Sequence, residues 1–161
     1  MIRRATAEDA EVIGELWLKL VNYHQALDVD LPRASRDGAS RYAQRVNARL
    51  DDPHSRIFVA EEDGQVVGYV LGVVVDLVPD MFVQERSGFL ADIYVLDEYR
   101  NRAIGRALVD ALIEWFKSQG LRYFEWHVAV ANDAARAFWY SLGGRDSMIR
   151  MRYDLFEESD S

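Results

Sequence analysis

Apolar side chains recur along this chain with two different periods, one typical of helices and one typical of strands. Near the start, residues 2–5 are predicted to form a short strand, and Thr6 with Asp9 then forms an N-cap signal. Apolar residues at helical spacing follow this signal: Ala10, Ile13, Leu16, Trp17 and Leu20. A second helix is predicted over residues 38–50. It ends before Pro53, because the residue preceding a proline resists the α region.

The middle of the chain has the composition of strands. Residues 56–61 and 65–71 are rich in apolar and β-branched side chains, and the Asp63-Gly64 pair between them is a strong hairpin signal. Residues 89–96 form another apolar run of strand length. Three strands are therefore predicted here, and the first two are joined by a tight turn.

The last third of the chain alternates between the two periods. Apolar positions over residues 104–117 have helical spacing, and Gly120 ends that helix. A strand is predicted over residues 122–130, a helix capped by Asn132 runs to residue 142, and a final strand is expected near residues 148–153.

This order of elements predicts an α/β fold, a single-domain mixed sheet of about six to seven strands flanked by about four helices. The 161 residues contain no low-complexity linker, so residues 1–156 are expected to form one domain. The acidic residues 157–161 are expected to be a disordered tail.

Composition narrows the possible functions. The absence of Cys excludes disulfides, a thiolate nucleophile and Cys-ligated zinc, so no metal is expected and a cytoplasmic location is the default. No apolar run reaches the roughly 20 residues that span a bilayer, and the N-terminus lacks an apolar signal core, so no membrane association is expected. With 27 acidic and 19 basic residues the net charge is −8, which disfavours nucleic acid as a partner and favours a cationic ligand.

The segment from residue 92 to residue 108 carries the clearest chemical signal. A short loop between a strand and a helix directs unpaired backbone N–H groups outward, and Arg100, Arg102 and Arg106 lie beside it. This combination suits a pyrophosphate. The alternative is a solvated basic edge that pairs with nearby acidic residues: Asp97, Glu98 and Asp110. The position of the loop between an apolar strand and an amphipathic helix favours the phosphate site.

Two motifs carry a family resemblance. The loop, Arg100-Asn101-Arg102-Ala103-Ile104-Gly105, resembles the acetyl-CoA signature Arg/Gln-x-x-Gly-x-Gly/Ala of the GCN5-related N-acetyltransferase (GNAT) superfamily. Residues 132–144 are similar to that family's Asn-x-x-Ala-x-x-Phe-Tyr-x-x-Leu-Gly-Phe. The resemblance implies the GNAT (acyl-CoA N-acyltransferase) fold, acetyl-CoA as cosubstrate and a primary amine as acceptor.

The sequence departs from the family pattern at three places. Ala103 replaces the first glycine of the loop, which narrows the freedom of the backbone there. Gly144 replaces the usual Phe after Leu-Gly. Trp139 stands where the family has the Tyr that acts as general acid, and Tyr140 lies one residue later, about 100° around the helix. The general acid is therefore unassigned, with Tyr140 or water as the alternatives.

The resemblance assigns the acetyl-CoA contacts to the strand, the loop and the later helix. Backbone groups of Ile93 and Val95 are expected to pair with the pantetheine amides, and a backbone N–H near Val95 to polarise the thioester carbonyl. The residues assigned to acetyl-CoA are Ile93, Tyr94, Val95, Arg100, Asn101, Arg102, Ala103, Ile104, Gly105, Arg106, Asn132, Ala135, Phe138 and Trp139.

Two side chains are candidates for removing the proton of the acceptor ammonium. Histidine is the side chain most often used as a general base, and His127 stands directly before Val128, as the catalytic His does in amino-terminal peptide acetyltransferases that the sequence resembles here. Its alternative role is that of a surface His alternating with Glu125. Asp92 resembles an acidic position that helps to hold the amine in diamine acetyltransferases, and its alternative role is that of a capped or ion-paired edge residue.

The resemblance places the acceptor pocket between the end of the first long helix and the segment before the strand at residues 89–96. The expected pocket residues are Tyr23, His24 and Asp28 from the helix end and Glu85 from that segment. A solvated helix end would explain the first three equally well. The predicted function is acetyl transfer from acetyl-CoA to a small-molecule, polyamine-like or peptide amine, and the alternative is a non-catalytic acyl-CoA-binding or sensing module. A homodimer is also predicted, because the apolar residues 73–75 and 77–78 lengthen the strand that begins at residue 65 and would invite edge pairing, and because the resemblance implies that such domains often pair.

Overall fold

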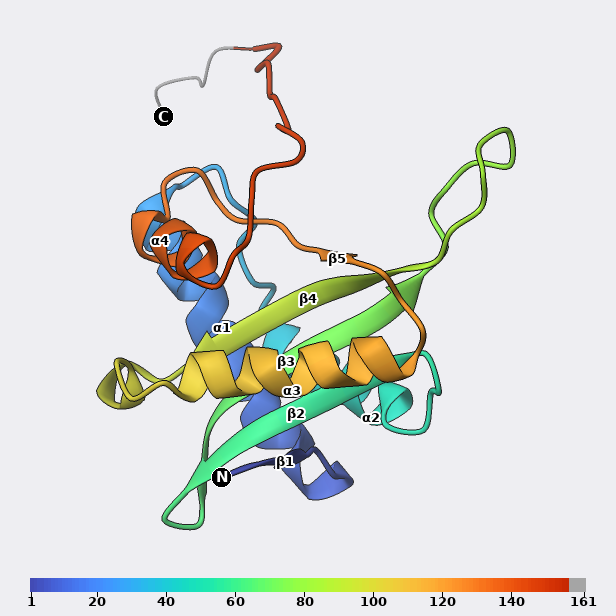
Figure 1. Ribbon diagram of the computed structural model, residues 1–161. Helices are drawn as coiled ribbons and strands as arrows, with labels where there is room; N and C mark the ends of the chain where they lie inside the picture. Colours follow the sequence, from blue (N-terminus) through green and yellow to red (C-terminus); the bar gives the residue numbers. More distant parts are fainter. Residues whose placement is uncertain (157–161) are drawn as a thin grey trace.

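The computed structural model describes residues 1–156, which form a mixed sheet with helices on both of its faces (Figure 1). The strands are β1 (Ile2–Arg4), β2 (Ser55–Glu62), β3 (Gln65–Val75), β4 (Ser87–Val95) and β5 (Phe124–Glu125). The helices are α1 (Ala10–Leu27), α2 (Gly38–Arg49), α3 (Ile104–Ser118) and α4 (Asp133–Ser141), with short 3₁₀ turns at Ala7–Asp9 and Asp97–Tyr99. The predicted α/β class is confirmed.

The five strands lie in the order β1-β2-β3-β4-β5. Neighbours are antiparallel except β4 and β5, which run parallel and are connected through α3. The predicted hairpin joins β2 and β3, and Asp63 and Gly64 both have positive φ, of 50° and 76°. Those dihedrals are what a two-residue turn between right-twisted strands requires.

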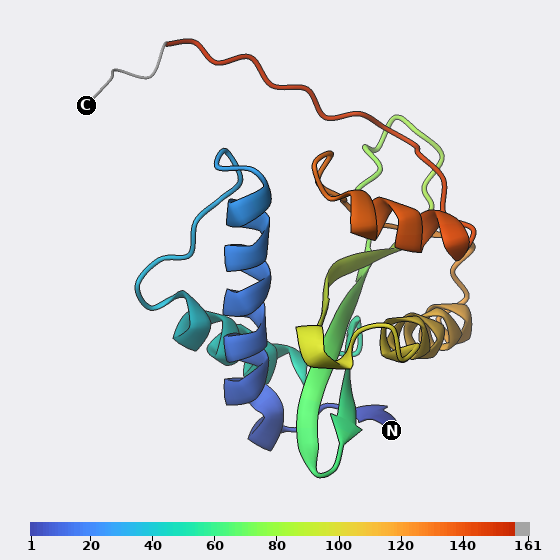
Figure 2. The ribbon, with the colours of Figure 1, turned by 90° about the vertical axis from the view of Figure 1, so that its left-hand side faces the viewer.

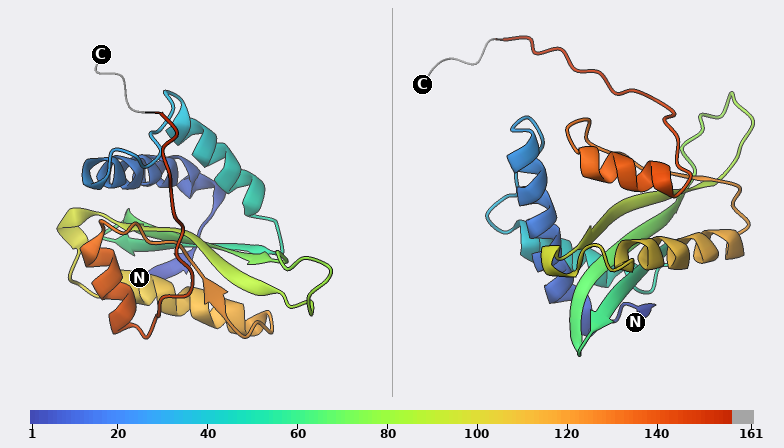
Figure 3. Two further views of the ribbon diagram at one scale, coloured as in Figure 1. Left: turned by 90° about the horizontal axis from the view of Figure 1, so that it is seen from above. Right: turned by 60° about the vertical axis from the view of Figure 1, so that its left-hand side comes forward.

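The helices form two layers that enclose the sheet. Figures 2 and 3 show α1 and α2 over one face and α3 and α4 over the other. Each layer has its own core cluster, with Ile13 and Val46 in the first and Leu108 and Leu112 in the second. Strand β3 contributes to both, because Tyr69 packs in the first cluster and Val70 in the second. No helix within residues 1–156 combines the length and the apolar character needed to cross a membrane.

The strand predictions need three corrections. The final strand expected near residues 148–153 is absent, and the one expected over residues 122–130 is reduced to the two residues of β5. The described residues therefore form five strands instead of six to seven. Of the apolar residues expected to lengthen this strand, Val73–Val75 belong to β3, which pairs with β2 up to Val73 and with β4 up to Val75. Leu77 and Val78 lie beyond the strand, and the homodimer stays a prediction. The acidic tail lies outside the described residues.

A β-bulge in β4 decides which way its side chains face. Leu71 pairs with Asp92 while Gly72 pairs with Leu90, so Ala91 is the extra residue. In a regular strand Leu90 and Asp92 would point to the same face, and one extra residue reverses that relation. Leu90 accordingly packs in the cluster under α3, whereas Asp92 faces the layer of α1 and α2.

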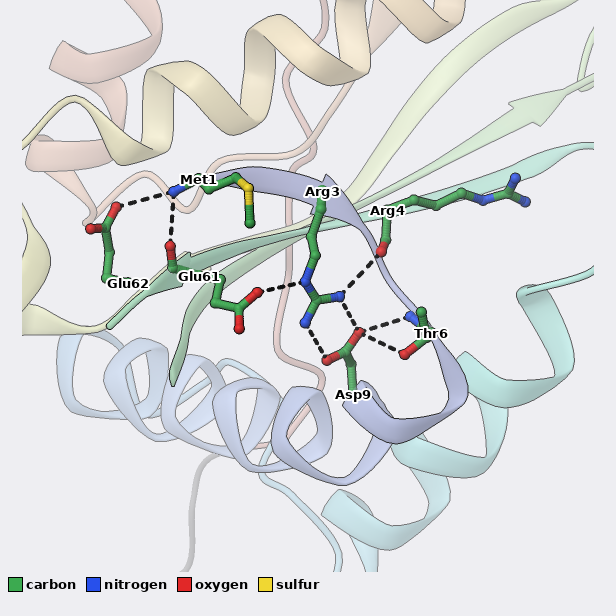
Figure 4. A network of polar contacts seen from close by, with 7 residues as sticks. All are labelled: Met1, Arg3, Arg4, Thr6, Asp9, Glu61 and Glu62. Atoms are coloured by element: carbon green, nitrogen blue, oxygen red, sulfur yellow. Dashed lines mark hydrogen bonds and ion pairs between the residues drawn. The ribbon is translucent and has the colours of Figure 1, made fainter. Parts of the chain in front are cut away.

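An ion-pair network ties the start of the chain to β2 (Figure 4). The guanidinium of Arg3 donates through Nη1 and Nη2 to both carboxylate oxygens of Asp9, at 2.8 and 2.9 Å, and through Nε to Glu61 at 2.7 Å. Asp9 also accepts the backbone N–H of Thr6 at 2.7 Å, which closes the predicted N-cap. The nearby guanidinium and these hydrogen bonds hold the pKa of Asp9 below its ordinary value.

Replacing Asp9 with Asn is expected to lower the free energy of unfolding by about 2–4 kcal/mol at neutral pH, because it leaves a partly buried guanidinium without its bidentate partner. A carboxyl whose pKa is lowered in the folded state stabilises the fold above the unfolded pKa, 3.8, and loses that contribution as pH falls through the folded pKa. Urea unfolding at pH 7 and at pH 3 should therefore show a difference that shrinks on acidification. The control Asp37→Asn removes an exposed ion pair with Arg41 and should change stability by less than about 1 kcal/mol.

Candidate active site

Strands β4 and β5 separate soon after they meet. They pair only at Gly88 with Phe124 and at Phe89 with Glu125. After β5 the chain is held by aromatic contacts, with the ring of Trp126 4.4 Å from that of Trp139 in α4. From Leu90 to Val95, the edge of β4 that faces away from β3 thus has no strand partner among the described residues.

The open edge of β4 presents backbone groups at alternate residues. The N–H of Leu96 donates to Val67 in β3 at 2.9 Å. Because successive residues of a strand direct their N–H groups to opposite sides, the N–H groups of Val95 and Ile93 point away from β3. These are the two residues at which the sequence placed pantetheine contacts.

The open edge leads directly to the N-terminus of α3. Asn101 and Ala103 have φ of 62° and 61°, and Ala103 is the N-cap of the helix in the left-handed region. Ala107 is the first residue whose N–H finds an intrahelical acceptor, the carbonyl of Ala103 at 3.0 Å. The backbone N–H groups of residues 104–106 are therefore left for another acceptor, and a left-handed residue followed by helical residues forms a concavity that suits an anion.

Replacing Ala103 with Gly is expected to raise the free energy of unfolding by about 0.5–1 kcal/mol, because an alanine with positive φ is strained and glycine is not. The gain is partly offset by the greater entropy of glycine in the unfolded chain. The matched control is Asn101→Gly, where the gain should be smaller because Asn tolerates this region better than Ala does. Thermal unfolding measures both, and a lower midpoint for Ala103→Gly would contradict the expectation.

The three arginines of the loop are not equivalent. Arg100 is held inward: its Nε donates to the carbonyl of Val95 at 3.1 Å, and its guanidinium lies 5.2 Å from the ring of Tyr23 and 5.3 Å from that of Tyr94. Arg102 lies over the ring of Tyr99 at 5.1 Å. Both Arg102 and Arg106 are exposed, and neither forms an ion pair within residues 1–156. These two guanidinium groups therefore have no charged partner among the described residues.

Helix α4 packs beside the N-terminus of α3. The side chain of Asn132 is buried and accepts the N–H of Ala135 at 3.1 Å, as an N-cap does. Phe138 faces α3, because a Cβ on Gly105 would lie 3.5 Å from its ring. The backbone at Gly105 therefore approaches α4 closely, and a large side chain there would meet Phe138.

The general acid remains unassigned. Trp139 is buried against Trp126 and has no acidic proton to give a thiolate. The hydroxyl of Tyr140, the alternative that the sequence left open, donates to Asp146 at 2.6 Å and accepts from Arg136. The hydroxyl of Tyr140 is thus engaged on the exposed side of α4.

Asp92 receives a hydrogen bond from a residue that the sequence did not single out. The hydroxyl of Tyr42 in α2 donates to Oδ2 of Asp92 at 2.7 Å. Burial raises the pKa of Asp92 from 3.8 to about 6, and the Tyr42 hydroxyl partly opposes that rise. A carboxyl with this pKa is ionised at neutral pH yet is a better proton acceptor than an exposed aspartate.

Aromatic rings fix the position of Tyr42. The ring of Trp17 in α1 stacks on it at 5.2 Å, and Gly38 packs so closely that a Cβ there would come within 2.9 Å of Trp17. The ring of Tyr69 lies 6.1 Å away on the other side, and its buried hydroxyl has no hydrogen-bond partner among the described residues. An unpaired buried hydroxyl costs about 1–3 kcal/mol. It is therefore a place where a polar ligand or a water would be stabilised, next to Asp92.

His127 lies in the segment after β5, and its ring is exposed. It meets the ring of Phe89 edge to face at 5.3 Å. Because Ala91 is the extra residue of β4, Phe89 and Asp92 point to the same face. His127 therefore lies on the Asp92 side of the sheet, and no hydrogen bond joins the two side chains.

The residues expected to form the acceptor pocket are only partly brought together. Tyr23 contacts Arg100, and the adjacent His24 is half-buried, which lowers its pKa. Asp28 accepts the N–H of Asp30 at 3.0 Å in the turn after α1. Glu85 pairs instead with Arg122 at 3.3 Å, in the β3–β4 loop that projects away from the end of α1 (Figures 1 and 3).

This chain is similar to known proteins in sequence and in structure. The sequence model of the Acetyltransferase (GNAT) family matches residues 17–143. Two uncharacterised N-acetyltransferases of Methanocaldococcus jannaschii are each 34% identical to this chain, over 149 residues (92% of the chain) and over 97 residues (60%). The chain spans 62% and 56% of the length of these two relatives. An N-alpha-acetyltransferase of Sulfurisphaera tokodaii is 28% identical over 108 residues, 65% of each chain.

Solved structures share the fold over almost the whole chain. A crystal structure of a Bacillus halodurans protein superimposes with a TM-score of 0.87 at 25% identity, covering 97% of this chain and 99% of that one. An aminoglycoside N-acetyltransferase in complex with CoA superimposes with a TM-score of 0.73 at 19% identity, covering 96% of this chain and 93% of that one.

Proposed function

Because this chain belongs to the acetyltransferase (GNAT) family, we propose that it binds acetyl-CoA along the open edge of β4 and transfers the acetyl group to a primary amine. The observation that supports this most directly is the separation of β4 from β5 beside the N-terminus of α3. It offers N–H donors for the pantetheine amides at one end and donors for a pyrophosphate at the other.

The residues of the loop fit the phosphates by their chemistry. The free N–H groups of residues 104–106 and the positive end of the α3 dipole favour an anion. Arg102 and Arg106 add two charges that no described residue neutralises. Arg100 serves this site indirectly, because its bonds to Val95 and Asp97 hold the loop against the end of β4.

Acetyl transfer requires the acceptor to attack as a neutral amine. The amine nitrogen forms a bond to the thioester carbonyl carbon, and the carbon–sulfur bond breaks. The departing thiolate takes a proton from water, and the hydroxide that remains takes the proton that the acylated nitrogen gives up. An alkyl ammonium has a pKa of about 10.4, so the site must help to remove its proton. In this proposal Asp92 attracts the ammonium and receives that proton, and the N–H of Val95 polarises the thioester carbonyl.

The environment of Asp92 also supports a cationic acceptor. Tyr42 donates to Oδ2 of its carboxylate, which leaves Oδ1 without a hydrogen bond from the described residues. The unpaired hydroxyl of Tyr69 lies beside it. An ammonium can donate to the carboxylate and to the phenolic oxygen together. The relatives named as N-alpha-acetyltransferase and aminoglycoside N-acetyltransferase are consistent with an amine acceptor.

The proposal is tested by thiol release from acetyl-CoA with a panel of amines: polyamines, aminoglycosides and peptides with free amino-termini. The protein has no Cys, so a thiol-reactive dye reports only the CoA that is released. We expect turnover with at least one cationic amine and, by mass spectrometry, an acetylated product. Binding of acetyl-CoA without turnover on any amine would instead favour the non-catalytic binding module, which Trp139 in place of the family's Tyr makes the second candidate.

A further inference from the structure

Phe89 in β4 is an aromatic side chain that neither layer of the core covers. Its ring is partly exposed, and it belongs to neither of the two core clusters. Val73, its partner in β3, packs against the cluster under α1 and α2, so Phe89 points to that same face of the sheet. The ring of the exposed His127 meets it edge to face at 5.3 Å. An aromatic surface is thus left partly uncovered on the face that carries Asp92.

Phe89 and Asp92 lie close together along β4. Val73 pairs with Phe89 and Leu71 pairs with Asp92, and these partners are two residues apart in β3. The two side chains are therefore separated by roughly 7 Å along the strand and point the same way. An amine whose ammonium contacts Asp92 would place a group at the end of a short alkyl linker on the ring of Phe89.

The side chains around Asp92 are otherwise uncharged. Those that share its face on the paired parts of β3 and β4 are Tyr69, Leu71, Val73, Phe89 and Tyr94. From the helices, Tyr42 donates to the carboxylate of Asp92, and Trp17 stacks on Tyr42. The raised pKa of Asp92 has two causes, burial and the opposing Tyr42 hydroxyl, so no second charge lies close to this carboxyl. A second ammonium on the same acceptor would have no counter-charge here.

The helices over this face do not supply that counter-charge either. Helix α2 contains no acidic residue, and the two of α1, Glu11 and Glu15, are exposed and precede Trp17 in the chain. Asp28, beyond the end of α1, accepts the N–H of Asp30. Other acidic residues of the surrounding loops are engaged in ion pairs: Asp30 with Arg152, Asp37 with Arg41, Glu85 with Arg122 and Asp97 with Arg100.

We propose that Phe89 selects the acceptor: the amine carries a single positive charge, bound at Asp92, and an aromatic or bulky apolar group that packs on the Phe89 ring. This inference rests on the proposed function, because it names the substrate class of that same site. Burying about 100 Å² of apolar surface on the ring favours such an amine by roughly 10- to 100-fold. A second ammonium placed there would lose its water without gaining a charged partner. Polyamines and aminoglycosides are therefore disfavoured.

The first test compares three amines on the unaltered chain: phenethylamine, propylamine, and the para-aminomethyl derivative of phenethylamine, which adds a second ammonium at the far end of the ring. We expect kcat/KM for phenethylamine to exceed each of the other two by at least about 10-fold. A doubly charged amine or propylamine that reacts as well as phenethylamine would overturn the inference and leave the proposed function intact. Turnover with no amine at all would overturn the proposed function, and this inference with it.

Variants of Phe89 test whether this ring makes the selection. Phe89→Ala is expected to lower the preference for phenethylamine over propylamine by about 10-fold, through KM more than kcat, because the ring contacts a part of the acceptor that does not react. Phe89→Glu supplies a carboxylate and should reverse the preference toward the para-aminomethyl derivative. The control Phe82→Ala removes a 62% exposed ring from the β3–β4 loop and should leave both preferences in place.

Acetyl-CoA affinity shows that each variant is folded, because Phe89 is not among the residues proposed to bind acetyl-CoA. A Phe89→Ala variant that binds acetyl-CoA normally and keeps the full preference for phenethylamine would overturn the assignment to this ring.

Discussion

Replacing Asp92 with Asn is expected to lower kcat for acetyl transfer by about 10²- to 10⁴-fold, because the variant lacks the group that accepts the proton of the ammonium. The side chain keeps its shape, so the hydrogen bond to Tyr42 can persist and the sheet should not be disturbed. The dissociation constant for acetyl-CoA should stay within a few-fold, since the phosphate-binding loop lies elsewhere. Steady-state kinetics and calorimetry on the same preparation measure the two effects.

The proposed role of Asp92 also predicts the direction in which activity changes with pH. Activity is expected to rise with pH through the pKa of Asp92, about 6, as the carboxyl becomes ionised. Tyr42→Phe removes a hydrogen bond that lowers this pKa, so the rise should move to higher pH. The control Tyr23→Phe removes a hydroxyl with no hydrogen bond to Asp92 and should leave the profile in place.

The matched variant His127→Gln separates the two candidates for proton removal. If His127 were the proton acceptor, this change would lower kcat by about 10- to 1,000-fold. Asp92→Asn would then raise the KM of the acceptor without a large change in kcat, because Asp92 would only hold the cation. Full activity in both variants would mean that neither side chain is catalytic and that ordered water removes the proton.

Replacing Arg102 and Arg106 together with Ala is expected to weaken acetyl-CoA binding by roughly 10²- to 10³-fold, because two charge-assisted contacts to phosphates are lost. Both side chains are exposed and take part in no ion pair among the described residues, so the fold should be unaffected. Calorimetry measures the dissociation constant.

Two controls make this result specific. Lys117→Ala removes an exposed cation from the other end of α3 and should leave binding unchanged. A pantetheine fragment, which lacks the pyrophosphate, should bind equally well to the double variant and to the unaltered chain, whereas dephospho-CoA, which keeps the pyrophosphate, should still depend on the two arginines. An unchanged dissociation constant in the double variant would show that the phosphates do not bind at this loop. Arg100→Ala is a poorer probe, because its bond to Val95 holds the loop in place.

Features of the fold that depend on residues close together in the chain could be predicted from the sequence. The β2–β3 hairpin depends on two turn residues, and the start of α3 depends on the change of period after the loop. The positive φ of Ala103 also follows from sequence, since the family places a glycine there. The residue pattern at 148–153 predicted a strand. A strand forms only beside a partner strand, and the described part of the chain provides none.

The surroundings of Asp92 could not be predicted in the same way. Tyr42 lies 50 residues earlier in the chain, on a helix whose apolar positions indicate only that it faces a core. The bulge at Ala91, which turns Asp92 toward that helix, has no signal in the residue pattern. In the sequence Arg100 cannot be distinguished from the other two arginines of the loop. Only the path of the loop places its guanidinium over the rings of Tyr23 and Tyr94.

The partly buried carboxyl of Asp92 links the proposed binding of a cationic acceptor to the stability of the fold. A carboxyl whose pKa rises from 3.8 to about 6 on folding favours the folded state fully only below pH 3.8, and that contribution is lost as pH rises through 6. At neutral pH the empty site therefore carries a charge that costs about 1–3 kcal/mol of stability. A cationic amine bound at Asp92 would offset that cost. Ionisation of this one carboxyl therefore lowers the stability of the fold, and a cationic acceptor bound at Asp92 is expected to stabilise the protein more at pH 8 than at pH 5.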